Sequence, residues 1–212
     1  MQTFTNRYAR PFTTNLPPLP LADQSWTHAW IWENRVVALA PGGLIVADRG
    51  MPDLDDLPAE MPWVDRLIAV VGGTPAPEPA PDWAATEARL GTRLPGDYKK
   101  IVETYGAQGL FDGFYRVLAP HELLDHTGTR AGDHPPFPAK GGALPWSNNE
   151  EEDLFFWITE DEDPDRWPVY AVDNCGDETL YEGSAAQYLL GLMTDPDNDS
   201  TPAGHWFMGS SR

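Results

Sequence analysis

The sequence predicts a globular domain that combines helices with one sheet, preceded by a β-rich N-terminal segment. This prediction depends on three observations: the order of helical and strand-like patterns, a proline-rich run that divides the chain, and the concentration of acidic residues near the C-terminal end. After the proline-rich run come two helical patterns, four strand-like runs and a last helical pattern. These patterns indicate a single sheet with helices before and after it.

The composition is that of a folded, strongly acidic protein. The 212 residues include 14 basic and 33 acidic side chains, which gives a net charge of −19 and a pI near 4.3. Disordered acidic chains contain few aromatic residues, whereas this chain has nine Trp, eight Phe and seven Tyr. Because nucleic acids and anionic membranes repel such a charge, we expect the protein to bind neither directly.

The chain shows no pattern for membrane insertion or secretion. Its longest apolar runs, 36–40 and 67–71, are far shorter than the roughly 18 residues of a membrane helix. The first 25 residues lack the apolar stretch of a secretion signal. Cys175 is the single cysteine, which excludes an intrachain disulfide, and we expect a cytoplasmic protein.

Residues 1–74 predict a β-rich extension or small subdomain. Pro41-Gly42-Gly43 supplies hairpin turn chemistry, and Pro62 suits the first position of a helix. Residues 75–81 alternate proline with small residues and predict a semi-rigid linker before a domain over 82–212. The strands predicted in this first part span 26–32, 35–40 and 44–48, and the helix spans 62–71.

Cap residues and periodicity delimit the helices predicted after the linker. Asp82 is an N-cap candidate and Gly91 a C-terminal stop, and the apolar residues of 98–105 recur at i, i+3, i+4 and i+7. Ser184 and Gln187 have the spacing of a capping box. The predicted helices span 82–90, 94–105 and 184–193, and the predicted strands span 114–118, 154–159, 167–173 and 179–182.

A recognisable set of residues extends over about 82–194. It consists of Trp83, Glu87, Leu90-Gly91, Leu94-Pro95-Gly96-Asp97-Tyr98-Lys99, Tyr105-Gly106, Phe114 to Pro120, Leu144-Pro145-Trp146, Gly183-Ser184 and Tyr188-Leu189. This set resembles the SUKH superfamily, which groups fungal cell-wall-synthesis regulators with bacterial toxin-immunity proteins. The resemblance implies an α+β fold with helices packed on one mainly antiparallel sheet, no enzymatic activity and no cofactor. The signature residues are spaced for core contacts and helix ends, so function must be sought on the surface.

Catalytic and metal-ligating residue types are present without the spacing that their chemistry needs. The five histidines are scattered, and Asp161, Asp163 and Asp165 imitate a calcium loop in which Arg166 replaces the required glycine. The sequence has no nucleophile elbow or phosphate loop, and neighbouring acids disfavour a Cys175 thiolate. We expect no metal site, no cofactor and no enzyme, with a carboxylate-based hydrolase as the remaining enzymatic alternative.

The strongest surface signal is acidic. Residues 145–199 carry sixteen acidic side chains and one basic side chain, Arg166, and two acidic runs flank one predicted strand. Such a negative field attracts a basic partner and accelerates its encounter. Three tryptophans lie nearby in the sequence, and they are either apolar anchors for a partner or core residues: Trp146, Trp157 and Trp167. The candidate partner-binding residues are Glu150, Glu151, Glu152, Asp153, Glu160, Asp161, Glu162 and Asp163.

The resemblance and the charge together predict a non-enzymatic binding protein. The leading interpretation is an immunity protein that neutralises a basic toxin, with a nuclease as the first choice, by covering its nucleic-acid surface. The alternative is a regulatory or scaffolding module for cell-wall or housekeeping proteins, in which the acidic surface only maintains solubility.

Overall fold

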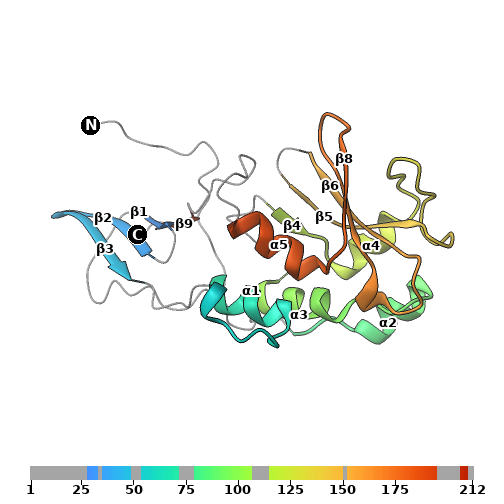
Figure 1. The fold of residues 1–212 in the computed structure, drawn as a ribbon, viewed down its shortest axis with the longest axis horizontal. Helices are drawn as coiled ribbons and strands as arrows, with labels where there is room; N and C mark the ends of the chain where they lie inside the picture. The colour runs from blue at the N-terminus through green and yellow to red at the C-terminus, as the bar shows by residue number, and fades with distance from the viewer. Residues whose placement is uncertain are drawn as a thin grey trace.

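The main body of the protein is a five-stranded antiparallel sheet with helices packed on one face (Figure 1). The computed structural model describes residues 28–32, 35–48, 54–71, 79–106, 115–149, 152–194 and 206–209. The strand order β4-β5-β6-β7-β8 follows the chain, so each strand pairs with the next one along the sequence. This arrangement confirms the predicted α+β fold. The strands are β4 (Tyr115–Val117), β5 (Ala143–Asn149), β6 (Leu154–Ile158), β7 (Val169–Val172) and β8 (Glu178–Tyr181).

The helices bury their apolar sides in one cluster with the sheet. Helix α1 packs against α3 and α5, α3 packs against α5, and α2 packs against α4. The described helices are α1 (Trp63–Val71), α2 (Trp83–Leu90), α3 (Gly96–Tyr105), α4 (Pro120–Asp125) and α5 (Ala185–Thr194), with 3-10 turns η1 (Leu54–Asp56) and η3 (Pro164–Arg166). None of these helices has the length and apolar character needed to cross a membrane.

Strand β6 is buried on both of its faces. Phe155 and Trp157 belong to the helix-side cluster, whereas Phe156 and Ile158 belong to a second cluster with Tyr170 on the opposite face. Successive strand residues point to opposite faces, so continuous burial requires cover on both sides. β6 is the middle strand of the five, and one apolar cluster covers each of its faces.

The two helices after the linker form where the sequence predicts them, α2 from its cap residues and α3 from its apolar periodicity. The Asp82 side chain accepts a hydrogen bond from the Ala85 amide at 3.0 Å, and Gly91 ends α2 in the left-handed region at φ 75°. Tyr98, Ile101 and Tyr105 of α3 are buried in the helix-side cluster. Trp83 is half-buried and contacts the Tyr98 ring edge-on, with 5.8 Å between ring centroids.

Strand β5 and helix α4 are absent from the sequence prediction. Pro145 interrupts the strand pattern of β5, and the structure accommodates it at an irregularity in the pairing with β6 between Pro145 and Ser147. Proline lacks the amide that a ladder needs, so it fits a sheet only at an edge or a bulge. Helix α4 has six residues, too few for periodicity to identify.

The N-terminal segment contributes to two parts of the structure. Its hairpin belongs to a separate four-stranded sheet of order β3-β2-β1-β9, and α1 packs against α3 and α5. Residues 72–78, which include most of the predicted linker, lie outside the described residues. The division into domains therefore stays a prediction. The strands of this sheet are β1 (His28–Trp32), β2 (Arg35–Ala40), β3 (Gly43–Asp48) and β9 (Trp206–Gly209).

Replacing Leu67 by Ala tests whether α1 is an integral part of the main core. Leu67 has no exposed surface, and truncating a buried leucine costs about 2–5 kcal/mol of unfolding free energy. The matched control is Leu44→Ala, because Leu44 is 69% exposed and its loss should cost under about 0.5 kcal/mol. Urea denaturation measures both variants. Equal effects of the two substitutions would contradict the packing of α1.

Candidate functional site

The two predicted acidic runs lie at opposite ends of β6. Asp153 precedes the strand and Glu160 lies beyond it, while Glu150 and Glu151 are outside the described residues. Seven residues of extended chain cover about 23 Å, whereas charges on a protein surface are screened over about 8 Å at physiological salt. The two runs therefore act as separate charged regions, each with its own neighbours.

The first region is the turn between β5 and β6, and hydrogen bonds hold its shape. The Asn149 side-chain amide donates to Asp153 Oδ2 at 2.6 Å, and the Asp153 amide donates to Asn149 Oδ1 at 2.9 Å. Glu152 stands in the left-handed region at φ 72° and is exposed. Asp153 therefore builds the turn, and Glu152 presents its carboxylate to solvent.

The turn between β7 and β8 lies beside the first region and adds further carboxylates. The Asn174 amide donates to Asp153 Oδ1 at 3.0 Å, which joins the two turns. Asp173 accepts from the amides of Cys175 at 2.9 Å and Asp177 at 2.8 Å. Sequence reasoning missed this neighbourhood, because it follows from the pairing of Leu154 with Val172 and no local pattern reveals that register.

We call the combined surface the acidic hairpin end. Its five members lie in or beside the two joined turns, and all except Asp153 are exposed. Within the described part of the chain, no Lys or Arg side chain forms an ion pair with any of them. The residues of the acidic hairpin end are Glu152, Asp153, Asp173, Asp177 and Glu178.

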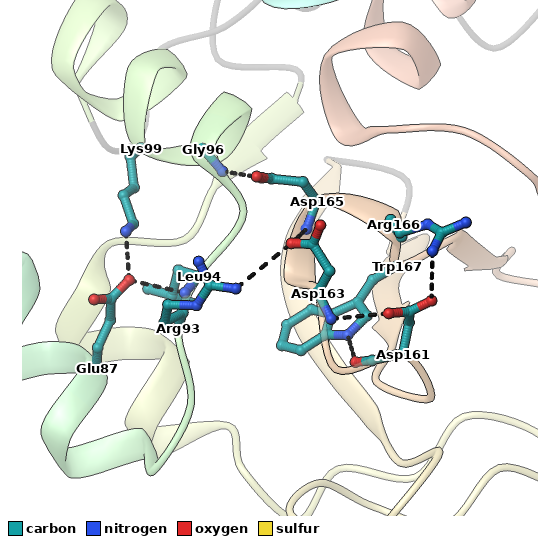
Figure 2. Close-up of polar contacts among 10 residues, drawn as sticks. All are labelled: Glu87, Arg93, Leu94, Gly96, Lys99, Asp161, Asp163, Asp165, Arg166 and Trp167. Carbon is teal, nitrogen blue, oxygen red and sulfur yellow. Dashed lines mark hydrogen bonds and ion pairs between the residues drawn. The ribbon is translucent and has the colours of Figure 1, made fainter.

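The second region is the connection between β6 and β7, where most carboxylates already have partners (Figure 2). Asp161 accepts from the Asp163 amide at 2.9 Å, and its carbonyl accepts from the Trp167 indole N–H at 2.8 Å. Asp163 caps η3 by accepting from the Asp165 amide at 3.4 Å. In this region Glu160 and Glu162 are the exposed carboxylates for which the described residues supply no hydrogen bond.

The same connection is fastened to the beginning of α3 (Figure 2). Asp165 Oδ1 accepts from the Gly96 amide at 2.6 Å, where an anion also compensates the positive end of the helix. Arg93 reaches Asp163 at 3.6 Å, and Arg166 reaches Asp161 at the same distance. These exposed ion pairs each stabilise the fold by less than about 1 kcal/mol. The second region is thus largely a structural element.

Glu87 and Lys99 extend this polar network on the other side of Arg93. Glu87 forms an ion pair with Lys99 and accepts from the Leu94 amide at 2.9 Å. Burial acts to raise the pKa of Glu87, but the Lys99 and Leu94 hydrogen bonds and the charges of Lys99 and Arg93 together lower it. Glu87, one of the residues that carry the family resemblance, therefore has a structural role in fixing the loop before α3.

Asp97 connects α3 to the beginning of α5. Its Oδ2 accepts from the Ala186 amide at 2.8 Å, its Oδ1 accepts from the Tyr98 amide at 2.7 Å, and Ser184 Oγ accepts from the Gln187 amide at 3.3 Å. Burial raises the pKa of the Asp97 carboxyl, although hydrogen bonds from Ala186, Ser184 and Tyr98 favour its ionised form. The predicted cap of the last helix is therefore completed by a residue from α3.

The remaining candidate groups are the metal-ligating side chains, Cys175 and three tryptophans. No group of three His, Cys, Asp or Glu side chains converges there in a way that could hold a metal ion. Cys175 is exposed, and its Sγ lies 3.3 Å from Asn174 Oδ1. The three candidate anchors Trp146, Trp157 and Trp167 are buried core residues, so they are not available to a partner.

Comparisons with known proteins give one positive result. A family model described as SMI1 / KNR4 family (SUKH-1) matches residues 79–199, which is more than half of the chain. Comparison with the curated proteins and with the solved structures gives no match. The matched range contains both acidic regions and every strand of the main sheet.

We predict that Asp97→Asn changes how stability depends on pH. Because burial raises the Asp97 pKa, the folded protein keeps the Asp97 proton to a higher pH than the unfolded chain does. The stabilisation that comes from protonated Asp97 is therefore complete below about pH 4, the ordinary Asp range, and is lost as pH rises through the raised pKa. The wild type should therefore lose stability relative to Asp97→Asn as pH rises. Denaturation curves from pH 4 to 7 measure this difference, and parallel pH profiles would contradict it.

The Asp97→Ala variant separates the hydrogen bonds from the charge. It removes the acceptor of the Ala186 amide at the start of α5, which should cost about 1–2 kcal/mol at every pH. Asp97→Asn keeps an acceptor oxygen and should cost less. A smaller loss for Ala than for Asn would show that Asp97 does not cap α5.

Proposed function

Because the chain belongs to the SMI1 / KNR4 family (SUKH-1), we propose that it is a non-enzymatic immunity protein that neutralises a basic toxin through its acidic surface. We take the toxin to be a nuclease and the place of action to be the cytoplasm. The observation that carries this proposal is the acidic hairpin end, where exposed carboxylates gather without a described basic neighbour.

The physical argument concerns unbalanced charge. In the β6–β7 connection, amides, Arg93 and Arg166 compensate the carboxylates. At the acidic hairpin end, Glu152 and Asp177 have no such partner among the described residues, so their field extends into solvent. A field of this kind raises the association rate of an oppositely charged protein by about tenfold or more at low salt.

A nuclease is the class of toxin that fits this surface best. A protein that binds nucleic acid does so by neutralising phosphates with Lys and Arg, so its active surface is basic. A carboxylate surface can occupy those side chains in place of the phosphates. Inhibition then requires only binding, with no chemical step by this protein.

Two double charge reversals test this proposal. We expect Glu152→Lys with Asp177→Lys to slow association with the toxin by about tenfold at low salt and to weaken its salt dependence. The matched control is Glu160→Lys with Glu162→Lys, which makes the same change in net charge at the other end of β6. The partner is first identified by co-purification, and stopped-flow mixing then measures the rate.

The outcomes of this comparison are distinct. Slower association for the first pair alone supports steering by the acidic hairpin end. Equal slowing by both pairs assigns the effect to net charge, and unchanged rates at low and high salt would leave the acidic residues with solubility as their role. Circular dichroism confirms the fold, since surface substitutions of this kind change stability by less than about 0.5 kcal/mol each.

A further inference from the structure

We infer that the outer edge of β8 is the docking edge of the protein, and that an extended basic segment of the partner adds there as a sixth strand of the sheet. This inference rests on the proposed basic protein partner and specifies how it is held. β8 is the last strand in the order β4-β5-β6-β7-β8, so one of its sides pairs with β7 and the other does not pair within the sheet.

The pairing pattern identifies the backbone groups on this edge. The Ile158 amide donates to the Pro168 carbonyl at 3.1 Å, so the even-numbered residues of β7 direct their backbone groups toward β6. The Asp173 amide donates to the Asp177 carbonyl at 3.0 Å, which sets the same alternation on β8. The backbone N–H and C=O groups of Thr179 and Tyr181 therefore point toward β7. The corresponding groups of Glu178 and Leu180 point outward, away from the sheet.

The residues of β8 are mostly exposed, although the Glu178 carboxylate accepts a hydrogen bond from the Tyr170 hydroxyl and lies close to Gly132. Glu178, Thr179 and Leu180 are exposed, and Leu180 keeps 50% of its surface accessible. Leu154 is 36% exposed and lies on the same face as Leu180, because Leu154 pairs with Val172 and Val172 pairs with Glu178. Leu180 therefore provides an apolar contact beside the free backbone groups, while Leu154 lies two strands further into the sheet.

Native proteins protect sheet edges with very short strands, charged side chains, proline, bulges or covering segments. β8 is short, with four residues beginning at Glu178, but it contains no proline and no bulge. β8 has the sequence Glu-Thr-Leu-Tyr, and its four pairs with β7 run without a register shift. A straight, exposed strand of this kind is the template that peptide recognition by strand addition requires.

Charge decides which strand can pair there. Asp177 and Glu178 lie at one end of β8, and the exposed Glu182 lies just past the other end. In an antiparallel pairing of two copies centred on Leu180, Glu178 of each would stand opposite Glu182 of the other, and such like-charged pairs are unfavourable. A segment with Lys or Arg four residues apart and an apolar residue midway between them instead meets a carboxylate at both ends and leucine between, because residues 178, 180 and 182 lie on the same face.

A defined peptide tests this inference on the full-length protein. The probe is the blocked heptapeptide Thr-Lys-Thr-Val-Thr-Lys-Thr, whose two Lys and central Val lie on one face of a strand, and the charge control is the same peptide with Glu in place of Lys. We expect the basic peptide at millimolar concentration to slow amide hydrogen exchange at Leu180 by about tenfold, which corresponds to one added hydrogen bond of about 1.4 kcal/mol. Intermolecular NMR contacts between the peptide and Glu178 or Leu180 should accompany this protection.

A matched pair of variants isolates the backbone hydrogen bond. Leu180→Pro removes the outward N–H, which β7 does not use, and proline is tolerated where an edge N–H faces solvent. Leu180→Val keeps that N–H with a similar loss of leucine surface. We expect Leu180→Pro to weaken peptide binding by about tenfold relative to Leu180→Val. The contacts to wild-type protein remain informative if Leu180→Pro does not fold.

The outcomes separate this inference from the proposed function. Equal binding of the basic peptide to the Pro and Val variants, with shifts confined to Glu152 and Asp177, would overturn strand addition and leave a basic partner supported. Equal binding of the acidic and basic peptides would overturn the charge argument. No effect of the basic peptide on β8 would overturn the docking edge, while the charge-reversal kinetics would still decide the proposed function.

Discussion

The burial of Trp157 in the middle of the sheet is the contact on which most of the structure depends. Its ring lies 5.2 Å from Tyr98 of α3 at 87°, 5.5 Å from Trp146 of β5 at 18°, and 6.3 Å from Trp167 at 52°. Edge-on and offset contacts of this kind stabilise beyond the area they bury. One side chain therefore joins a helix, a neighbouring strand and the β6–β7 connection.

This central position of β6 also determines where charge can lie. Because Phe155 to Ile158 are buried on alternate faces, polar residues have room only at the two ends of the strand. The chain must turn at both ends, and turns expose side chains to water. The acidic runs occupy those two turns, so a constraint on the core separates them and gives each a different set of neighbours.

The beginning of α3 is the second point of convergence. The Gly96 amide binds Asp165 from the β6–β7 connection, and Asp97 binds the Ala186 amide of α5. Tyr98, the next residue, donates its hydroxyl to the Leu118 carbonyl at 2.6 Å. The Leu-Pro-Gly-Asp-Tyr signature of residues 94–98 thus connects α3 to three distant segments, which explains those residue types through structure.

The sequence predicted correctly those elements that depend on residues close together in the chain. The caps at Asp82 and Gly91, the helix that carries Tyr98 and the strand of β6 follow from side-chain chemistry and periodicity near each position. It missed β5, where Pro145 conceals a strand, and the joining of Asp153 to the β7–β8 turn. Both depend on pairing between segments far apart in the chain, which no single window of sequence contains.

The two ends of β6 show that the role of an acidic side chain depends on the hydrogen-bond donors around it. At the β6–β7 connection, the amides of Gly96, Asp163 and Asp165 donate hydrogen bonds to the carboxylates of three aspartates, so these carboxylates stabilise the turn. At the opposite end, Asp153 and Asp173 shape their turns while Glu152 and Asp177 stay unpaired among the described residues. Counting acidic residues treats both ends alike. The availability of donors distinguishes them, because backbone amides together with Arg93 and Arg166 already compensate part of the carboxylate charge at the β6–β7 connection, which leaves less of that charge to attract a partner's Lys or Arg.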